Sequence, residues 1–133
     1  MSTEAAVITG VVEQMLDHAA NGRWQALEEV LDEQFVIIEP DSLPYGGAHH
    51  GIEGYVALMQ QIGELFEPVF EPQDLYALNE ETVVLRMHVT FTARNTGRSV
   101  KLRVVELLEV GGGRVRRSEV FLADTAALLA TLA

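Results

Sequence analysis

The first part of the chain carries apolar residues at helical spacing. Apolar side chains recur at steps of three and four over residues 7–19, which predicts an amphipathic helix that Ser2 or Thr3 caps. Asn21-Gly22 ends this helix, and a second apolar stripe over residues 24–31 predicts a shorter helix behind it. The short Asn-Gly link between the two stripes predicts an antiparallel helix pair.

A β-rich run and a third helix follow. The sequence F-V-I-I-E at Phe35–Glu39 predicts a strand, and Pro40 stops it because proline cannot extend the interior of a paired strand. Residues 41–51 are rich in turn-forming side chains and predict an irregular loop. After Gly51, apolar residues repeat at steps of three and four as far as Phe66, which predicts a helix.

Beyond Pro68 the apolar period changes from helical spacing to alternation, which is typical of β-strands. Pro68 and Pro72 predict that the first of these strands lies at an edge or is bent. Three longer strands separated by hairpin turns, and a short helix capped by Asp124, are predicted over residues 82–93, 100–110, 114–123 and 125–132. Helices on one side of a curved antiparallel sheet predict a single α+β domain over residues 1–133, with room for a pocket between its layers.

One charged residue interrupts an otherwise apolar strand face. Within residues 100–110, every second side chain is apolar except Glu106. Alternate side chains of a strand point to opposite faces, so we expect Glu106 inside the core. A buried carboxylate needs a partner or a use. Two interpretations follow: a structural ion pair, with Arg103 or Arg117 for example, or a functional acid in a cavity.

A second acid, Glu39, ends the first strand on the same face as Phe35 and Ile37. This position lets its carboxyl reach the mouth of a pocket, and a solvated carboxylate at a strand end is the alternative. Two carboxyls that face one apolar cavity titrate differently. Burial raises the pKa of the drier acid, which stays protonated, while the wetter acid ionises and acts as a base.

Composition limits the size, the location and the partners that we expect for the protein. The 133 residues are 48% apolar, which is enough for one domain with a core, and no apolar run reaches the ~18 residues of a membrane span. No basic segment followed by an apolar one marks a signal peptide, and the chain has no cysteine, so we expect a cytoplasmic protein without disulfides. The net charge of −11 argues against nucleic acid and anionic membranes as partners.

Five short sequence motifs follow one another in a characteristic order along almost the whole chain: Asn21-Gly22-Arg23-Trp24, Glu39-Pro40, Gly51-Ile52-Glu53-Gly54, Gly113-Arg114-Val115 and Phe121-Leu122-Ala123-Asp124. With them the chain resembles the nuclear transport factor 2-like superfamily, which includes ketosteroid isomerases, SnoaL-like polyketide cyclases, limonene epoxide hydrolases and scytalone dehydratases. The resemblance implies a cone-shaped α+β barrel in which three helices close a small-molecule cavity. It also implies a homodimer formed through the outer face of the sheet.

The resemblance assigns roles to the two acids. Ketosteroid isomerases carry a general base at the place of Glu39, before a proline, and a hydrogen-bond donor to the developing enolate at the place of Glu106. Their first helix carries a tyrosine as a second donor, whereas this chain has Met15 there. We therefore expect proton transfer by Glu39 and Glu106 without the phenol network, and the missing tyrosine argues against steroid isomerisation.

The substrate pocket is expected to be mostly apolar and of modest size. Its predicted wall consists of inward-facing residues of the helices and strands, with one histidine at the mouth: Tyr55, Met15, Met59, Met87, Phe91, Ser118 and His50. No metal or other cofactor is expected. Adjacent His49 and His50 point apart in extended chain, so they do not chelate a metal, and no further ligand has metal spacing.

Several other residues have two interpretations each. Glu119 faces outward with Arg117 in a regular strand, and inward if a bulge intervenes. His88 belongs to the surface or to the dimer face, and His18 is a pocket donor or a partly buried structural histidine. The loop Tyr45–Gly47 is a lid or an ordinary turn.

Two classes of function remain open. The first is a cofactor-independent enzyme that isomerises, cyclises or dehydrates a small apolar substrate, or hydrolyses an epoxide, with Glu39 and Glu106 as the proton-transfer pair. The second is a non-catalytic dimeric protein that binds an apolar ligand or serves as an accessory module. The two classes differ in whether both acids face one enclosed cavity.

Overall fold

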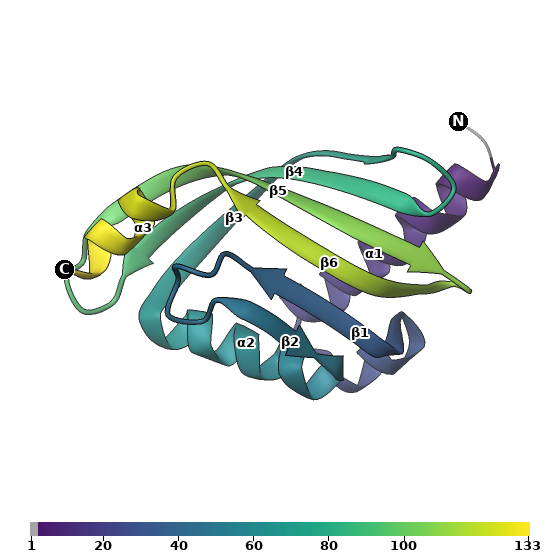
Figure 1. Cartoon of the computed structure of the whole chain (residues 1–133), viewed down its shortest axis with the longest axis horizontal. Helices are drawn as coiled ribbons and strands as arrows, with labels where there is room; N and C mark the ends of the chain where they lie inside the picture. The colour runs from purple at the N-terminus through teal and green to yellow at the C-terminus, as the bar shows by residue number, and fades with distance from the viewer. Residues whose placement is uncertain (1–2) are drawn as a thin grey trace.

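The structure of the chain, a computed structural model, describes residues 3–133 as a curved sheet with helices against its concave side (Figure 1). The helices are α1 (Thr3–Ala20), the short 3₁₀ helix η1 (Gln25–Glu29), α2 (Gly51–Leu65) and α3 (Thr125–Leu132). The strands are β1 (Leu31–Glu39), β2 (Gly47–His50), β3 (Phe66–Ala77), β4 (Thr82–Ala93), β5 (Ser99–Gly111) and β6 (Arg114–Leu122). Ser2, one of the two expected cap residues, lies outside the described residues. No helix in residues 3–133 is long and apolar enough to cross a membrane.

The six strands form one open, mixed sheet in the order β2-β1-β6-β5-β4-β3. Neighbouring strands are antiparallel as predicted, except that β1 and β6 run parallel, with Ile37 beside Ser118. A parallel pair needs a long connection. Here the chain passes through α2 and the whole meander from β3 to β5 after β1 and before β6. The predicted α+β fold, with helices over a curved sheet and a short C-terminal helix, is confirmed.

Three segments differ from the elements that the sequence predicts. The stripe over residues 24–31 forms only η1, because Leu31 already belongs to β1 and pairs with Val115 of β6. Part of the predicted loop forms β2, an edge strand that pairs with the end of β1. Phe66, expected at the end of a helix, is the fully buried first residue of β3. In each segment, pairing within the sheet overrides the local pattern.

The turn between β5 and β6 depends on two glycines. Gly112 and Gly113 have φ of 60° and 77°. A two-residue hairpin loop of type I′ needs positive φ at both central positions, which glycine adopts without strain. The turn brings β6 back along β5, and the pairing places Glu106 directly opposite Val120.

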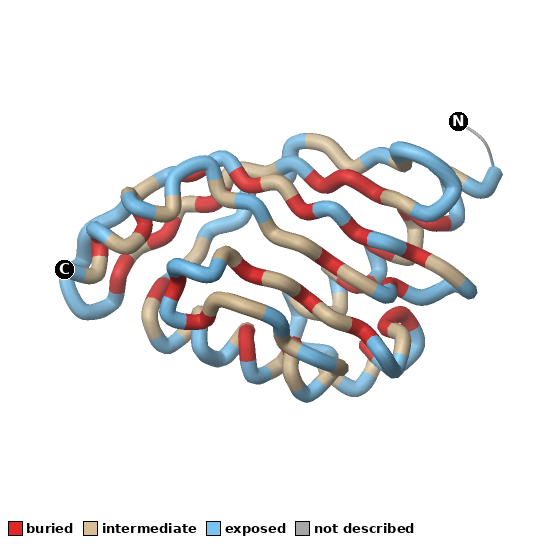
Figure 2. Tube along the Cα trace, in the orientation of Figure 1, coloured by how far each residue is buried: buried red, intermediate tan, exposed pale blue. Residues whose placement is uncertain are grey.

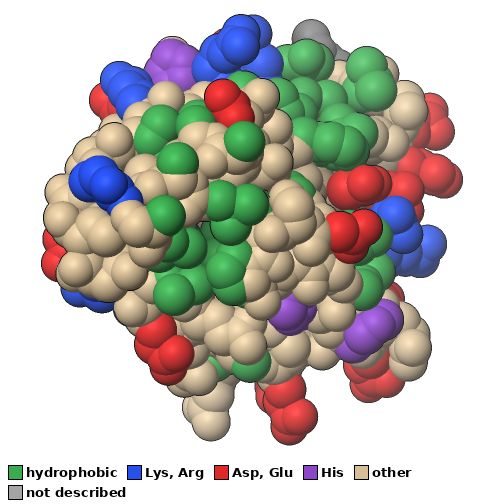
Figure 3. Space-filling model, turned by 60° about the vertical axis from the view of Figure 1, so that its left-hand side comes forward, with side chains coloured by type: hydrophobic (Ala, Val, Ile, Leu, Met, Phe, Trp, Pro, Cys, Tyr) green, Lys and Arg blue, Asp and Glu red, His purple; other side chains and the backbone are tan. Residues whose placement is uncertain are grey.

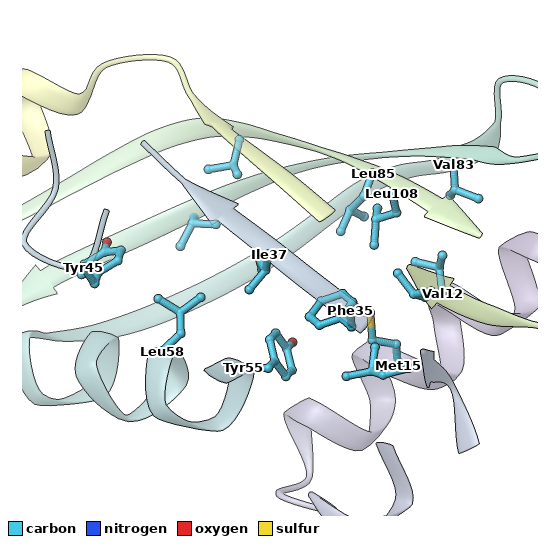
Figure 4. Close-up of a cluster of buried hydrophobic side chains, with 14 of the residues drawn as sticks. Val12, Met15, Phe35, Ile37, Tyr45, Tyr55, Leu58, Val83, Leu85 and Leu108 are labelled. Carbon is cyan, nitrogen blue, oxygen red and sulfur yellow. The ribbon is translucent and has the colours of Figure 1, made fainter. Parts of the chain in front are cut away.

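The core lies between the sheet and the helices α1 and α2, and buried residues alternate with exposed ones along the strands (Figure 2). Met15 of α1, Phe35 of β1 and Leu58 of α2 are only 1%, 0% and 0% exposed. Phe35 and Tyr55 pack edge to face, with ring centroids 5.8 Å apart (Figure 4). Burying a side chain of this size stabilises a fold by about 1.5–3 kcal/mol, so these contacts hold the two helices against the sheet.

Candidate functional site

A cavity of about 330 Å³ lies between the concave face of the sheet and helices α1 and α2. Its wall is largely apolar and includes residues of every strand except β2. Among residues 3–133, only four polar side chains line it: Glu39, Tyr45, Tyr55 and Glu106. A cavity of this size with a few convergent polar groups is typical of a small-molecule site.

The two acids face each other across a single strand. In the parallel pair, Ile38 lies beside Glu119, so Glu39 lies beside Val120, and in the antiparallel pair Val120 lies opposite Glu106. Val120 also lines the cavity, between the two acids. Two strand spacings place the Cα atoms of Glu39 and Glu106 about 10 Å apart. A ligand atom above Val120 is therefore within reach of both carboxyls.

Both acids are buried, and burial raises the pKa of each. Glu39 is 6% exposed, and desolvation together with the nearby charge of Glu106 raises its pKa to about 8. Glu106 is 8% exposed, and desolvation raises its pKa as well. The hydroxyl of Ser118, itself 0% exposed, donates a hydrogen bond of 2.8 Å to Glu106 Oε1 and opposes the rise in the pKa of Glu106.

These interactions favour one ionised and one protonated acid. The Ser118 hydroxyl stabilises the carboxylate form of Glu106. A charge on Glu106 in turn raises the pKa of Glu39, which has no such donor among residues 3–133. The acids titrate as a coupled pair, and burial raises the pKa of both, while the Ser118 hydroxyl stabilises a charge on Glu106 alone. The sequence leads us to expect that Glu106 stays protonated and Glu39 ionises. The raised pKa of Glu106 agrees with the first expectation, whereas the raised pKa of Glu39 differs from the second.

The ion-pair interpretation of Glu106 does not hold. No ion pair within residues 3–133 includes Glu106. Arg117 instead pairs with Glu119 of the same strand, with 3.5 Å between Arg117 Nη2 and Glu119 Oε1. Glu119 does not line the cavity, so of its two interpretations the structure shows the outward one.

Two tyrosines complete the polar part of the site. Tyr55 projects from α2 toward Phe35 of β1 (Figure 4), and both Tyr55 and Tyr45 line the cavity. Both are 4% exposed. Burial raises the pKa of each phenol, and so do the neighbouring acids: Glu106 and Glu39 act on Tyr55, and Glu39 acts on Tyr45. The four polar groups therefore share one electrostatic environment.

The oxygens of this group are available to a ligand. Within residues 3–133, no side chain donates to or accepts from Glu39, Tyr45 or Tyr55, and Glu106 has a single donor, Ser118. No fully buried side-chain polar atom in the same part of the chain lacks a hydrogen-bond partner. The free oxygens consequently have open surface, and the open surface next to these residues is the cavity.

The loop that carries Tyr45 is a fixed wall of the cavity. Its backbone closes through hydrogen bonds from Leu43 N to Pro40 O and from Gly46 N to Leu43 O, and His49 Nε2 lies 2.7 Å from Tyr45 O. A Cβ at position 46 would lie 2.4 Å from Pro40 O, so only glycine fits there. Of the two interpretations of this loop, the structure shows an ordered turn. The turn signals were visible in the sequence, but nothing in them indicated that the tyrosine points inward.

Six of the predicted site residues line the cavity: Glu39, Glu106, Tyr55, Met59, Met87 and Phe91. Helix α1 contributes Leu16, Ala19 and Ala20 to the wall in place of Met15, and the sequence pattern did not single these three out as cavity residues. Met15 is 1% exposed and belongs to the core between α1 and the sheet.

Two further predicted residues lie outside the cavity wall. Ser118 lies behind Glu106 as its hydrogen-bond donor and does not line the cavity. His50 pairs with Val36 in the sheet and is exposed, because the inward face of β1 belongs to Phe35 and Ile37.

The remaining histidines lie away from the cavity wall. His18 accepts a hydrogen bond of 3.1 Å from Arg23 Nε, and His88 lines a groove on the outer face of the sheet with Arg86 and Arg103. Among residues 3–133, no group of three or more His, Cys, Asp or Glu side chains is placed to hold a metal ion.

The curved open sheet, the helices on its concave side and the enclosed cavity together define the NTF2-like α+β cone fold. The sequence profile of the SnoaL-like domain matches residues 12–118, and the chain belongs to this family. The resemblance inferred from the sequence is thereby confirmed. No curated protein matches the sequence.

Solved structures agree with this assignment. An NTF2-like protein from Burkholderia xenovorans LB400 is 22% identical, with a TM-score of 0.87 over 97% of this chain and 98% of that chain. A candidate SnoaL-like polyketide cyclase from Jannaschia sp. CCS1 is 18% identical, with a TM-score of 0.84 over 99% of this chain and 95% of that chain. TerC, crystallised with polyporic acid, is 18% identical, with a TM-score of 0.76 over 92% and 97% of the two chains. At these identities the likeness shows the fold.

Proposed function

We propose that the protein is a cofactor-independent acid–base enzyme that acts on a small, largely apolar carbonyl compound. The observation that supports this most directly is the pair of buried carboxyls, Glu39 and Glu106, on the wall of one enclosed apolar cavity. Groups whose environments favour opposite protonation states are the usual acid and base of such sites.

The proposed reaction starts with proton abstraction next to the carbonyl group. The carboxylate of Glu106 takes the proton, the electron pair of the C–H bond moves into the new C=C bond, and the carbonyl oxygen gains negative charge. Protonated Glu39 and the hydroxyls of Tyr45 and Tyr55 are the available donors to that oxygen. Return of the proton to another carbon gives an isomer, and attack of the enolate carbon on a second carbonyl gives a ring.

The comparisons support a reaction on a small organic molecule. Proteins of the same fold include a candidate polyketide cyclase and a protein crystallised with polyporic acid. The cavity of this chain, at about 330 Å³, lies at the small end of the usual range of ligand sites. The apolar wall supports a substrate with few polar groups.

Hydrogen exchange tests the proposal without knowledge of the natural substrate. Cyclic ketones and 1,3-diketones that fit the cavity are incubated with the protein in D₂O, and loss of the proton next to the carbonyl is followed by NMR. We expect exchange above the buffer rate, and a decrease of about 10²–10⁴-fold in Glu106→Gln and in Glu39→Gln.

The matched control is Glu109→Gln, which changes an exposed acid of the same strand, β5. This variant should exchange at the wild-type rate. Wild-type exchange no faster than buffer across the set, or undiminished exchange in both cavity variants, contradicts the proposal. Ligand binding without exchange would instead favour a non-catalytic binding protein.

We also propose a homodimer formed through the outer face of the sheet. On that face, Leu107 of β5 is 37% exposed and Phe121 of β6 is 44% exposed, and Val105, the strand partner of Phe121, lies between them. Large exposed side chains that adjoin one another mark an interaction surface. Dimerisation would cover them without touching the cavity on the opposite face.

A further inference from the structure

The cavity carries acidic groups and no basic one. The titratable side chains on its wall are two carboxyls and two phenols, and no Lys, Arg or His of residues 3–133 lines it. The parts of the wall from α1, β3, β4 and β6 are entirely apolar. A ligand with a negative charge therefore meets only groups that repel it once they ionise, whereas a cation is attracted by the same groups.

We propose that the cavity binds apolar molecules that carry one protonated amine, with the ammonium group above Val120 between Glu39 and Glu106. This inference rests on the proposed use of the cavity as a small-molecule site, and not on turnover. It adds one basic nitrogen, at the end of the molecule, to the small and largely apolar ligand of the proposed function.

The number of hydrogen bonds supports the proposal. A primary ammonium has three donors and no acceptor. The site offers free oxygens on Glu39, Glu106 and Tyr55, and the single donor within residues 3–133, Ser118, occupies only one oxygen of Glu106. Tyr55 lines the same cavity as both acids. Each N–H of the ammonium thus has an acceptor that is otherwise unused.

The burial of the Glu39 carboxyl also supports the binding of an amine. Glu39 is an almost completely buried acid without a hydrogen-bond donor in residues 3–133, and a buried carboxylate is stable only when it is paired. Tyr45, Tyr55 and Phe91 also line the cavity, and aromatic rings are side chains that can attract a cation. On the outer surface, acidic side chains are scattered over the face in Figure 3, and the net charge of −11 draws cations toward the molecule.

Proton release accompanies this binding mode. With a pKa of about 8, Glu39 is largely protonated at pH 7. An ammonium beside it favours the carboxylate form, and the other titratable groups that face Glu39 are Glu106, Tyr45 and Tyr55. Binding of an amine at pH 7 should therefore release up to about 0.9 protons, the protonated fraction of Glu39.

Isothermal titration calorimetry with three ligands of one shape tests the proposal. Cyclohexylmethylamine, cyclohexylmethanol and cyclohexanecarboxylate present a cation, a neutral group and an anion on the same ring. At pH 7 we expect the amine to bind at least about tenfold more tightly than the alcohol, since hydrogen bonds to charged groups are the stronger ones. The carboxylate should bind most weakly. Titrations in two buffers of different ionisation enthalpy measure the protons released.

Three variants separate the contributions. Glu106→Gln should weaken binding of the amine by at least about tenfold and leave binding of the alcohol unchanged. Glu39→Gln should abolish proton release, and Glu109→Gln, on the outside of β5, should change neither quantity.

Alcohol or carboxylate binding as tight as the amine, an unchanged affinity for the amine in Glu106→Gln, or no binding of the amine would overturn the inference. Because these are equilibrium measurements, amine binding without hydrogen exchange contradicts the proposed enzyme and leaves the ligand class intact. Hydrogen exchange without a preference for the amine contradicts the proposed ligand class and leaves the proposed enzyme intact.

Discussion

The buried carboxyl of Glu39 should make the protein less stable as the pH rises. The pKa of this group is 4.5 in its ordinary environment and about 8 in the folded chain. Between these values the folded state holds one proton more than the unfolded state. The stability conferred by protonated Glu39 is therefore fully present below pH 4.5 and is lost as the pH rises through 8. Each pH unit in this interval costs about 1.4 kcal/mol of the free energy of unfolding.

Glu39→Gln tests this relation because glutamine keeps the shape of the protonated acid and cannot ionise. The linkage places the variant within about 1 kcal/mol of the wild type at pH 5 and makes it more stable by about 4–5 kcal/mol at pH 9. That is a large part of the 5–15 kcal/mol that stabilises a typical domain. Urea unfolding followed by far-UV circular dichroism, at half-unit steps from pH 5 to pH 9, gives both curves.

The decisive quantity is the difference between the two curves, because the many surface acids change both in the same way. Glu109→Gln is the control, and its curve should run parallel to that of the wild type at all pH values. Glu106→Gln should diverge in the same direction as Glu39→Gln, since burial raises the pKa of Glu106 too. A difference between wild type and Glu39→Gln that stays constant or shrinks from pH 5 to pH 8 would refute the reasoning.

Three further predictions concern other parts of the structure. Ser118→Ala removes the donor to Glu106 Oε1, so the pKa of Glu106 should rise further in ¹³C NMR titrations, with a stability loss of about 1–3 kcal/mol. Gly46→Ala places a Cβ against backbone oxygen and should cost about 1–3 kcal/mol in urea unfolding, whereas Gly10→Ala, with open space around it, should be neutral or stabilising. Phe121→Glu should shift the protein from dimer to monomer in light scattering, and a dimer that persists at micromolar concentration would contradict the proposed interface.

The sequence pattern predicted those helices and strands that bury one side and expose the other. The helical spacing of α1 and α2 and the alternation of β4 and β5 bury one side of each element, so pattern and structure agree. The pattern of β2 is too short to indicate anything, and this strand exists because the end of β1 offers it a partner. Likewise, the sequence pattern places Leu31 in a helix, but Leu31 pairs with Val115 of β6 and belongs to β1.

The candidate site was predictable where it depends on which face of an element is buried. Glu106 stood out as the one charged residue on an apolar strand face, and it does line the cavity. Met15 is on the buried face of α1 by the same reasoning but lies in the core, because a periodic pattern does not show where the core ends and the cavity begins. Tyr45 could not be predicted, since the inward turn of its loop depends on contacts of Gly46 with the backbone before it.

The pairing of the two acids depends on strand order, which the sequence pattern does not contain. Glu39 and Glu106 belong to strands far apart in the chain, and they meet because β6 inserts between β1 and β5. The same strand decides how the pair ionises. Ser118 of β6 donates to Glu106 and not to Glu39, so one acid gains a partner for its charge and the other does not. A different neighbour for β1 would separate the two acids and leave the hydrogen bond from Ser118 to Glu106 in place, so the proposed proton transfer depends on the order β1-β6-β5.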